Sequence, residues 1–269
     1  MNEHMLESRG IYYRTNEWSE GRPTIVFMHG LSGSSSAWLP HEQLVTETHN
    51  ILSFDLRGHG KSKKYKEYGD YTMSLLANDL YQLIEFLKIE KFALITHSFG
   101  VLIALEFLKL HQDRVSAALF LSPEFSVRRR LLSRLIEPLF VFTHVFSLIP
   151  FNAEAGRHVD YQRHSEAHDW NIPMTYEDVQ NTGLRIYLYC SKQVFAVDYT
   201  DLLPNIIIPM TLVQGKQDSI FLVSNSEIMA ECIPHAKRIL LDHADHIIVV
   251  NHIDRIGIIL KEFVATLPI

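Results

Sequence analysis

The sequence predicts an α/β fold: a mostly parallel, doubly wound sheet with a helical segment inserted between two of its strands. Three observations support this prediction. Short apolar runs alternate with helical patterns, several of these runs are apolar at every position, and the alternation stops after Leu121 and resumes at Ile206. Strands that are apolar throughout are typical of parallel sheets whose two faces are both covered by helices.

The expected strands are short runs rich in β-branched and aromatic residues. They cover Gly10–Arg14, Thr24–Met28, Asn50–Phe54, Phe92–Ile95, Ala117–Leu121, Pro209–Val213 and Arg238–Leu241. Helices are expected over Met73–Leu87, which carries one apolar stripe, over Phe99–Leu110, which is apolar nearly all round, and over the amphipathic Asp254–Leu267. This alternation implies right-handed crossovers and a doubly wound sheet.

The stretch from Ser122 to about Leu203 shows no convincing strand. It holds an arginine triplet at 128–130, an apolar run at 139–149 and a polar, His-rich patch. The simplest arrangement is a core formed by residues 1–121 and 206–269, with residues 122–205 as a helical cap. Such a cap would lie above the carboxyl ends of the strands, where open α/β sheets bind ligands.

Length and composition make some classes of function less consistent with the chain than others. The chain has 269 residues, 47% of them hydrophobic and 21% charged, as in an ordinary soluble globular protein. A net charge of -6 argues against a nucleic-acid partner. The two cysteines form no CxxC pair and no secretory signal is visible, so a cytoplasmic location is expected. No oligomeric state is predicted.

The longest apolar run, residues 139–149, is too short to span a bilayer and lies between two prolines. A buried or half-buried helix is the expected structure. The alternative is an apolar lid over a lipid-like substrate. Such a lid would allow weak lipid contact through the cap but no stable membrane insertion.

A candidate nucleophile follows the strand at Phe92–Ile95, where residues 96–100 (T-H-S-F-G) lead directly into an apolar helix. Strand, tight turn and helix form the context that a nucleophile elbow requires. Ser98 would lie at the helix N-terminus, where the helix dipole favours developing negative charge. The usual pattern is G-x-S-x-G, and Thr96 replaces its first glycine. On this pentapeptide alone, an ordinary N-cap serine is an equal alternative.

A second loop, residues 27–33 (F-M-H-G-L-S-G), ends another predicted strand. Gly30 and Gly33 allow the backbone to approach a ligand closely. Acyl transfer needs N–H donors directed at the tetrahedral oxyanion. The backbone N–H groups of Leu31 and Phe99 are the candidates, and an ordinary β-to-α loop is the alternative.

Two further strand ends carry an acid and a histidine. Asp218 ends V-Q-G-K-Q-D, and His246 ends L-D-H-A-D-H. A serine is a weak nucleophile until a base takes its proton, and the imidazole base needs a carboxylate to fix its tautomer. The chain order Ser98, Asp218, His246 is the order found in α/β-hydrolases.

With these motifs in order, the chain resembles the α/β-hydrolase fold superfamily, in its cap-bearing esterase, lipase and peroxidase-like branch. The motifs are H-G-L-S-G-S with a downstream Trp38, D-L-R-G-H-G-K-S, T-H-S-F-G, G-K-Q-D and D-H-I-I-V-V-N-H, and they cover almost the whole core. The resemblance implies Ser98 as nucleophile, His246 as base and Asp218 as orienting acid. It also implies the oxyanion donors named above. A serine nucleophile argues against haloalkane dehalogenases and epoxide hydrolases, which use aspartate there.

Other residues compete for the base and the acid. His243 and His252 flank His246, which is favoured because an apolar helix follows it at once. Glu124 follows the strand before the cap, where some members of the fold place their acid. Asp245 is too close to His246 in sequence to reach its ring easily.

No cofactor and no metal are expected. His164 and His168 have metal-ligand spacing if they lie on a helix, but no third ligand is evident. The arginines at 128–130 could attract an acidic group, although a hinge of solvated charges is the preferred interpretation.

The substrate pocket is expected between Ser98 and the cap. Composition alone suggests as wall residues His29, Phe140, Phe142, Phe146 and Trp170. The predicted activity is hydrolysis of a carboxylic ester of a small to medium, apolar small molecule through an acyl-enzyme. A C–C bond hydrolase, a thioesterase or a lactonase with the same triad is the alternative. A non-enzymatic ligand receptor is a third hypothesis, and the complete triad counts against it.

Overall fold

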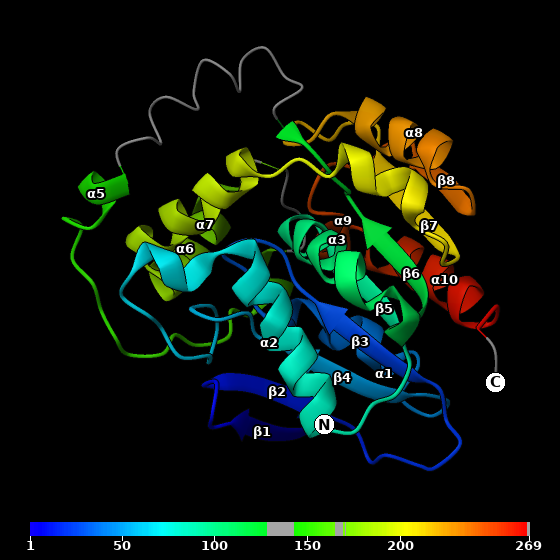
Figure 1. Cartoon of the computed structure of the whole chain (residues 1–269), viewed down its shortest axis with the longest axis horizontal. Coiled ribbons are helices and arrows are strands. Elements are labelled where there is room, and N and C mark those ends of the chain that lie inside the picture. Colours follow the sequence, from blue (N-terminus) through cyan, green and yellow to red (C-terminus); the bar gives the residue numbers. More distant parts are fainter. Residues whose placement is uncertain (128–142, 165–168, 170, 268–269) are drawn as a thin grey trace.

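The computed structural model describes residues 1–127, 143–164, 169 and 171–267. One eight-stranded sheet organises the molecule, in the order β1-β2-β4-β3-β5-β6-β7-β8 (Figure 1). The strands are β1 (Asn2–Leu6), β2 (Ile11–Thr15), β3 (Thr24–Met28), β4 (Asn50–Phe54), β5 (Phe92–His97), β6 (Val115–Leu121), β7 (Met210–Gly215) and β8 (Ala236–Leu241). The β1–β2 and β2–β4 pairs are antiparallel and the other pairs are parallel, which confirms the predicted sheet.

Helices cover both faces of this sheet. They are α1 (Leu39–Gln43), α2 (Met73–Phe86), α3 (Phe99–His111), α8 (Val223–Cys232), α9 (Ile248–Asn251) and α10 (Ile253–Val264). Buried residues of α2 and α3 form one core, in front of the strands in Figure 1, and those of α9 and α10 belong to a second core. Along β3, Val26 and Met28 enter the first core, whereas Ile25 and Phe27 enter the second. Two covered faces explain why this strand is apolar throughout.

The structure adds one strand that the sequence pattern did not predict. The edge strand β1 pairs in antiparallel register with β2, Leu6 opposite Ile11. Its first four residues are exposed and mostly polar, so it lacks the apolar run used to recognise the others. The predicted bounds of β3 and β4 are exact, while β6 and β8 begin two residues earlier than expected.

Between the neighbouring strands β6 and β7 lie helices and, in the described residues, no strand. They are α5 (Thr143–Phe146), η6 (Tyr161–His164), α6 (Ile172–Thr182), α7 (Leu184–Ala196) and η7 (Thr200–Asn205). We call the residues between β6 and β7 the inserted segment. Helix α7 contacts η2 (Tyr68–Tyr71), in the chain that follows β4, so the segment packs over the carboxyl ends of the strands (Figure 1). The boundaries 122–205 of a cap domain stay a prediction.

The apolar run at 139–149 is described only from residue 143. There it forms the short helix α5 and a turn, in which Val145 is 47% and Leu148 80% exposed. Phe146 and Ile149 are half-buried, Phe146 against the first core, so the described part of the run fits the expectation of a half-buried helix with an exposed side. Among the helices that the structure describes, none is long and apolar enough to cross a membrane.

Candidate active site

The turn between β5 and α3 has the strained geometry of a nucleophile elbow. Ser98 has φ 53° and ψ −117°, a region that non-glycine residues rarely adopt. Its N–H donates to the Leu121 carbonyl at 3.0 Å, and its own carbonyl accepts from the N–H of Val101 at 2.8 Å. The side chain is 7% exposed. The fold thus holds the Ser98 hydroxyl at the end of β5 and at the start of α3.

Close packing around Gly100 explains how a threonine fits this elbow. A Cβ atom on Gly100 would overlap Thr96 Oγ1 and would lie 2.7 Å from the carbonyl oxygen of His29. The Thr96 side chain therefore occupies space that the missing side chain of Gly100 leaves open. Its buried hydroxyl has no hydrogen-bond partner among the described residues.

Ser98, His246 and Asp218 form a hydrogen-bonded chain. Ser98 Oγ lies 2.7 Å from His246 Nε2, and His246 Nδ1 lies 2.9 Å from Asp218 Oδ2. The other carboxylate oxygen, Oδ1, accepts the backbone N–H groups of Ile220 and Phe221 at 2.9 and 2.8 Å. Because an ionised carboxylate only accepts, Nδ1 carries the ring proton and Nε2 can accept the Ser98 proton.

Three side chains form hydrogen bonds with the backbone of His246. Its carbonyl accepts the Ser122 hydroxyl at 2.7 Å and His97 Nε2–H at 2.9 Å. Burial, and then the nearby His246 ring, lower the pKa of His97 to about 3, so that ring is neutral. The N–H of His246 donates to the carboxylate of Asp169, in the inserted segment. Sequence reasoning missed all three groups, because nothing in their spacing relates them to His246.

The two rival carboxylates have other hydrogen-bond partners. Glu124 is buried and accepts hydrogen bonds from the Asn225 amide at 2.7 and 2.6 Å. Asp245 accepts the N–H of Ile247 at 3.1 Å and the Asn251 amide at 2.8 Å, at the start of α9. His243 is exposed. Asp218 is the carboxylate that binds the His246 ring.

The two candidate oxyanion donors both line the space beside Ser98. Leu31 lies in the loop after β3, and Phe99 is the first residue of α3, where backbone N–H groups have no intrahelical partner. A Cβ atom on Gly30 would lie 3.3 Å from Ser98 Cβ, so the loop passes directly beside Ser98. The role of Leu31 and Phe99 as oxyanion donors stays a prediction.

His29 holds this loop to the next strand end. Its Nε2 accepts the N–H of Leu56 at 2.9 Å, so Nδ1 donates to the Gly30 carbonyl at 2.7 Å. Burial lowers the pKa of the His29 ring, which favours this neutral form. The ring also lines the cavity, where it was expected.

A cavity of about 450 Å³ opens between Ser98 and the inserted segment, a size suited to a small organic ligand. The floor includes Ser98 and His246. Helix α6 contributes Met174, Thr175 and Asp178, and helix α7 contributes Tyr187, Ser191, Val194 and Phe195. Most of the wall is apolar, and Tyr161, Asp169 and Asp178 add polar groups that the sequence did not suggest.

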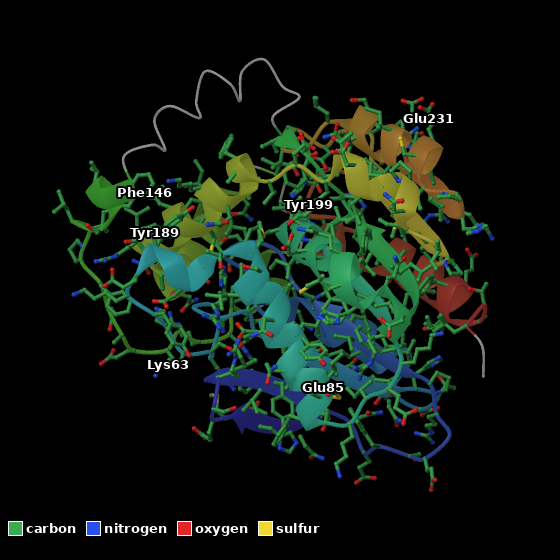
Figure 2. The ribbon with its side chains drawn as sticks, viewed as in Figure 1. Lys63, Glu85, Phe146, Tyr189, Tyr199 and Glu231 are labelled. Carbon is green, nitrogen blue, oxygen red and sulfur yellow. The ribbon has the colours of Figure 1, made fainter. Side chains whose placement is uncertain are left out.

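Of the four aromatic wall residues predicted from composition, the structure describes one. Phe140, Phe142 and Trp170 lie outside the described residues. Phe146 lies in α5, away from the cavity lining; it is half-buried and packs against the first core (Figure 2). Tyr189, labelled on α7 in Figure 2, is fully buried in that same core.

The predicted pairing of His164 and His168 on one helix face falls outside the described structure, which leaves out the His164 side chain and all of His168. Among the residues that the structure describes, no group of three or more His, Cys, Asp or Glu residues is arranged to hold a metal ion.

Curated relatives of the chain cover most of its length. The chain is 27% identical over 237 residues to a putative carbamate hydrolase RutD of Pseudomonas savastanoi pv. phaseolicola, covering 83% of the chain and 86% of the relative. It is 28% identical over 254 residues to the protein of the same name in Agrobacterium fabrum, covering 90% and 92%.

Solved structures share the fold. MGS-M2, an alpha/beta hydrolase from a Medee basin deep-sea metagenome library, has a TM-score of 0.79 at 17% identity over 100% of this chain and 98% of its own. The enol-lactonase from Burkholderia xenovorans LB400 has a TM-score of 0.72 at 20% identity, over 98% and 100%. The family described as alpha/beta hydrolase fold matches residues 23–253. The chain belongs to the alpha/beta hydrolase fold family.

Proposed function

We propose that the protein is a serine hydrolase that cleaves a carboxylic ester of a small to medium substrate through an acyl-enzyme. The observation that carries this proposal is the 2.7 Å hydrogen bond between Ser98 Oγ and His246 Nε2, with Asp218 on the opposite nitrogen of the ring. Family membership supports a hydrolase but leaves open which bond is cleaved.

In the proposed reaction, Ser98 Oγ attacks the ester carbonyl carbon while His246 Nε2 takes the hydroxyl proton. The electron pair of the carbonyl π bond moves to oxygen, and the N–H groups of Leu31 and Phe99 bind this oxyanion. As the carbonyl re-forms, the bond to the alcohol oxygen breaks and His246 gives its proton to the leaving alcohol. Water, deprotonated by His246, then attacks the acyl-enzyme in the same way and releases the acid.

The inserted segment supports the proposed binding of a substrate with apolar parts. Val194 and Phe195 of α7 and Met174 of α6 line the cavity, with Ile220 and Val250 from the core. Medium-length acyl or aromatic groups would bury apolar area against these walls. We therefore propose that the segment acts as a cap that selects the substrate.

Carbamate hydrolysis is a second candidate, supported by the name of the relatives, putative carbamate hydrolases. The same triad would attack a carbamate carbonyl, whose attached nitrogen makes it less electrophilic than an ester. Thioesters, lactones and C–C bonds next to a carbonyl are further substrates that this triad could cleave. A panel holding the acyl group constant while changing the leaving group separates these activities.

The decisive test of the triad is Ser98→Ala. We expect turnover of short-chain p-nitrophenyl esters to fall by about 10⁴- to 10⁶-fold, with an unchanged circular dichroism spectrum. A fluorophosphonate probe should label Ser98 in the wild type and nothing in the variant, by peptide mass mapping. Ser74→Ala, on an exposed position of α2, is the matched control and should retain full turnover. Full activity in Ser98→Ala would refute the proposal.

A further inference from the structure

A buried carboxyl group lies in the cavity wall away from the triad. Asp178 of α6 is 7% exposed and lines the cavity on the same helix face as Met174 and Thr175. Its Oδ1 accepts the hydroxyl of Tyr161, 2.9 Å away in η6 and also in the cavity wall. The reaction proposed above uses neither side chain.

The Asp178 carboxyl group has fewer hydrogen-bond partners than a buried carboxyl group usually has. Among the described residues, Tyr161 is the group that donates to Asp178, and no lysine, arginine or histidine pairs with it. Burial, with a smaller contribution from Glu177, raises the pKa of Asp178 to about 7. Buried polar atoms normally find hydrogen-bond partners, and a charged one without them is costly. No described group donates to Oδ2, so once Asp178 is ionised, above this pKa, Oδ2 can accept a hydrogen bond in the wall of a ligand cavity.

The Asp178–Tyr161 pair lines the same cavity as Ser98 and His246. A Cβ atom on Gly33 would lie 3.3 Å from the Tyr161 hydroxyl oxygen, and one on Gly30 would lie 3.3 Å from Ser98 Cβ. The pair thus borders the loop that runs beside the nucleophile. A small substrate whose carbonyl meets Ser98 can extend to Asp178 inside the same cavity.

A purely structural role, joining η6 to α6, would need only the bond between Tyr161 and Oδ1. An uncharged phenol–amide pair would serve that purpose without a buried carboxyl group. We propose that Asp178, oriented by Tyr161, is a specificity-determining residue that accepts a hydrogen bond from an N–H or O–H group of the substrate. This inference rests on the proposed function and refines it: the preferred ester carries one such donor within an otherwise apolar framework.

Two p-nitrophenyl esters that differ by one donor test this inference: the ester of N-acetyl-β-alanine, and that of 5-oxohexanoic acid, in which CH₂ replaces the N–H. The measured quantity is the ratio of their kcat/KM values at pH 8 or above, where Asp178 is ionised and can accept. We expect Asp178→Asn to lower this ratio about tenfold relative to wild type, because the amide's Oδ1 can still accept from Tyr161 while its NH₂ cannot accept from the substrate. Asp201→Asn removes an exposed carboxyl group elsewhere in the inserted segment, in η7, and should leave the ratio unchanged.

Binding separates a failure of this inference from a failure of the proposed chemistry. In a Ser98→Ala background, calorimetry with the methyl esters of the same two acids should show preferential binding of the N–H ester, lost in Ser98→Ala/Asp178→Asn. If wild type cleaves no ester and a fluorophosphonate does not label Ser98, the proposed function fails, and the binding ratio still decides the role of Asp178. A ratio that is equal with Asp and Asn at 178, in turnover and in binding, overturns the inference.

Discussion

The carboxylate of Asp169 accepts a hydrogen bond from the backbone N–H of His246, so the inserted segment holds the residue that would act as base. The second oxygen of Asp169 accepts both the N–H and the hydroxyl of Ser219, each at 2.8 Å. Ser219 directly follows Asp218. One carboxylate therefore joins the loop of His246 to the loop of Asp218, and both to the inserted segment.

Asp169→Asn tests whether this link positions the triad. Both oxygens of Asp169 accept from N–H or O–H donors, so an amide NH₂ must face one of these donors in either orientation. We expect kcat for a p-nitrophenyl ester to fall about tenfold or more while KM changes little, because the loss falls on alignment of His246 and not on the apolar walls.

The control for this prediction is Asp201→Asn, an exposed acid elsewhere in the inserted segment, which should behave as wild type. A rise in KM with unchanged kcat in Asp169→Asn would assign the residue to substrate binding instead. An equal loss of kcat and thermal stability in both variants would indicate a general effect of charge removal.

Ser98→Gly should be more stable than Ser98→Ala although both lack the hydroxyl. The backbone of Ser98, at φ 53° and ψ −117°, is strained for any residue with a Cβ atom and unstrained for glycine. We expect the glycine variant to have a free energy of unfolding about 1 kcal/mol or more above that of the alanine variant, measured in urea. Equal values would mean that the turn relaxes in the variants and holds no such strain.

The framework of the site was predictable because it follows from local patterns. The strands β3, β5 and β7 are runs of mostly buried residues, and β8 is a more exposed strand at the sheet edge. Their ends carry the loops of Leu31, Ser98, Asp218 and His246. Parallel strands bring their carboxyl ends to one edge of the sheet, so residues that follow different strands meet there. The chain order and the positions at strand ends were therefore enough to predict that Ser98, Asp218 and His246 meet.

The inserted segment was not predictable to the same depth. Asp169 contacts His246 across 77 positions, and Tyr161 meets Asp178 across 17. No periodicity encodes such contacts, because they depend on where short helices settle on the core. Composition suggested aromatic walls instead, and Phe146 turned away from the cavity because its helix, α5, packs against α7.

Thr96→Val should leave the fold intact or make it more stable. The Thr96 hydroxyl is buried without a partner among the described residues, and valine keeps the shape of the side chain. Replacing an unsatisfied hydroxyl with a methyl group removes a desolvation penalty, so we expect the free energy of unfolding to stay level or rise by about 1 kcal/mol. Ester turnover should be retained. A loss of more than about 1 kcal/mol would show that the hydroxyl binds a water molecule or another group.

Asp178→Asn should gain stability relative to wild type as the pH rises. The pKa of Asp178 is raised from an ordinary value of 3.8 to about 7, by burial first and by Glu177 to a smaller degree, while the Tyr161 hydrogen bond opposes the shift. Between these two values the folded protein keeps a proton that the unfolded chain has lost, so this group's stabilising contribution is present below pH 4 and is lost as the pH rises to 7. Asparagine does not titrate. The difference in free energy of unfolding between Asp178→Asn and wild type should therefore grow by about 1 kcal/mol or more from pH 4 to pH 8 in urea titrations, since each pKa unit corresponds to about 1.4 kcal/mol. A pH-independent difference would show that Asp178 is ionised in the folded protein throughout this range.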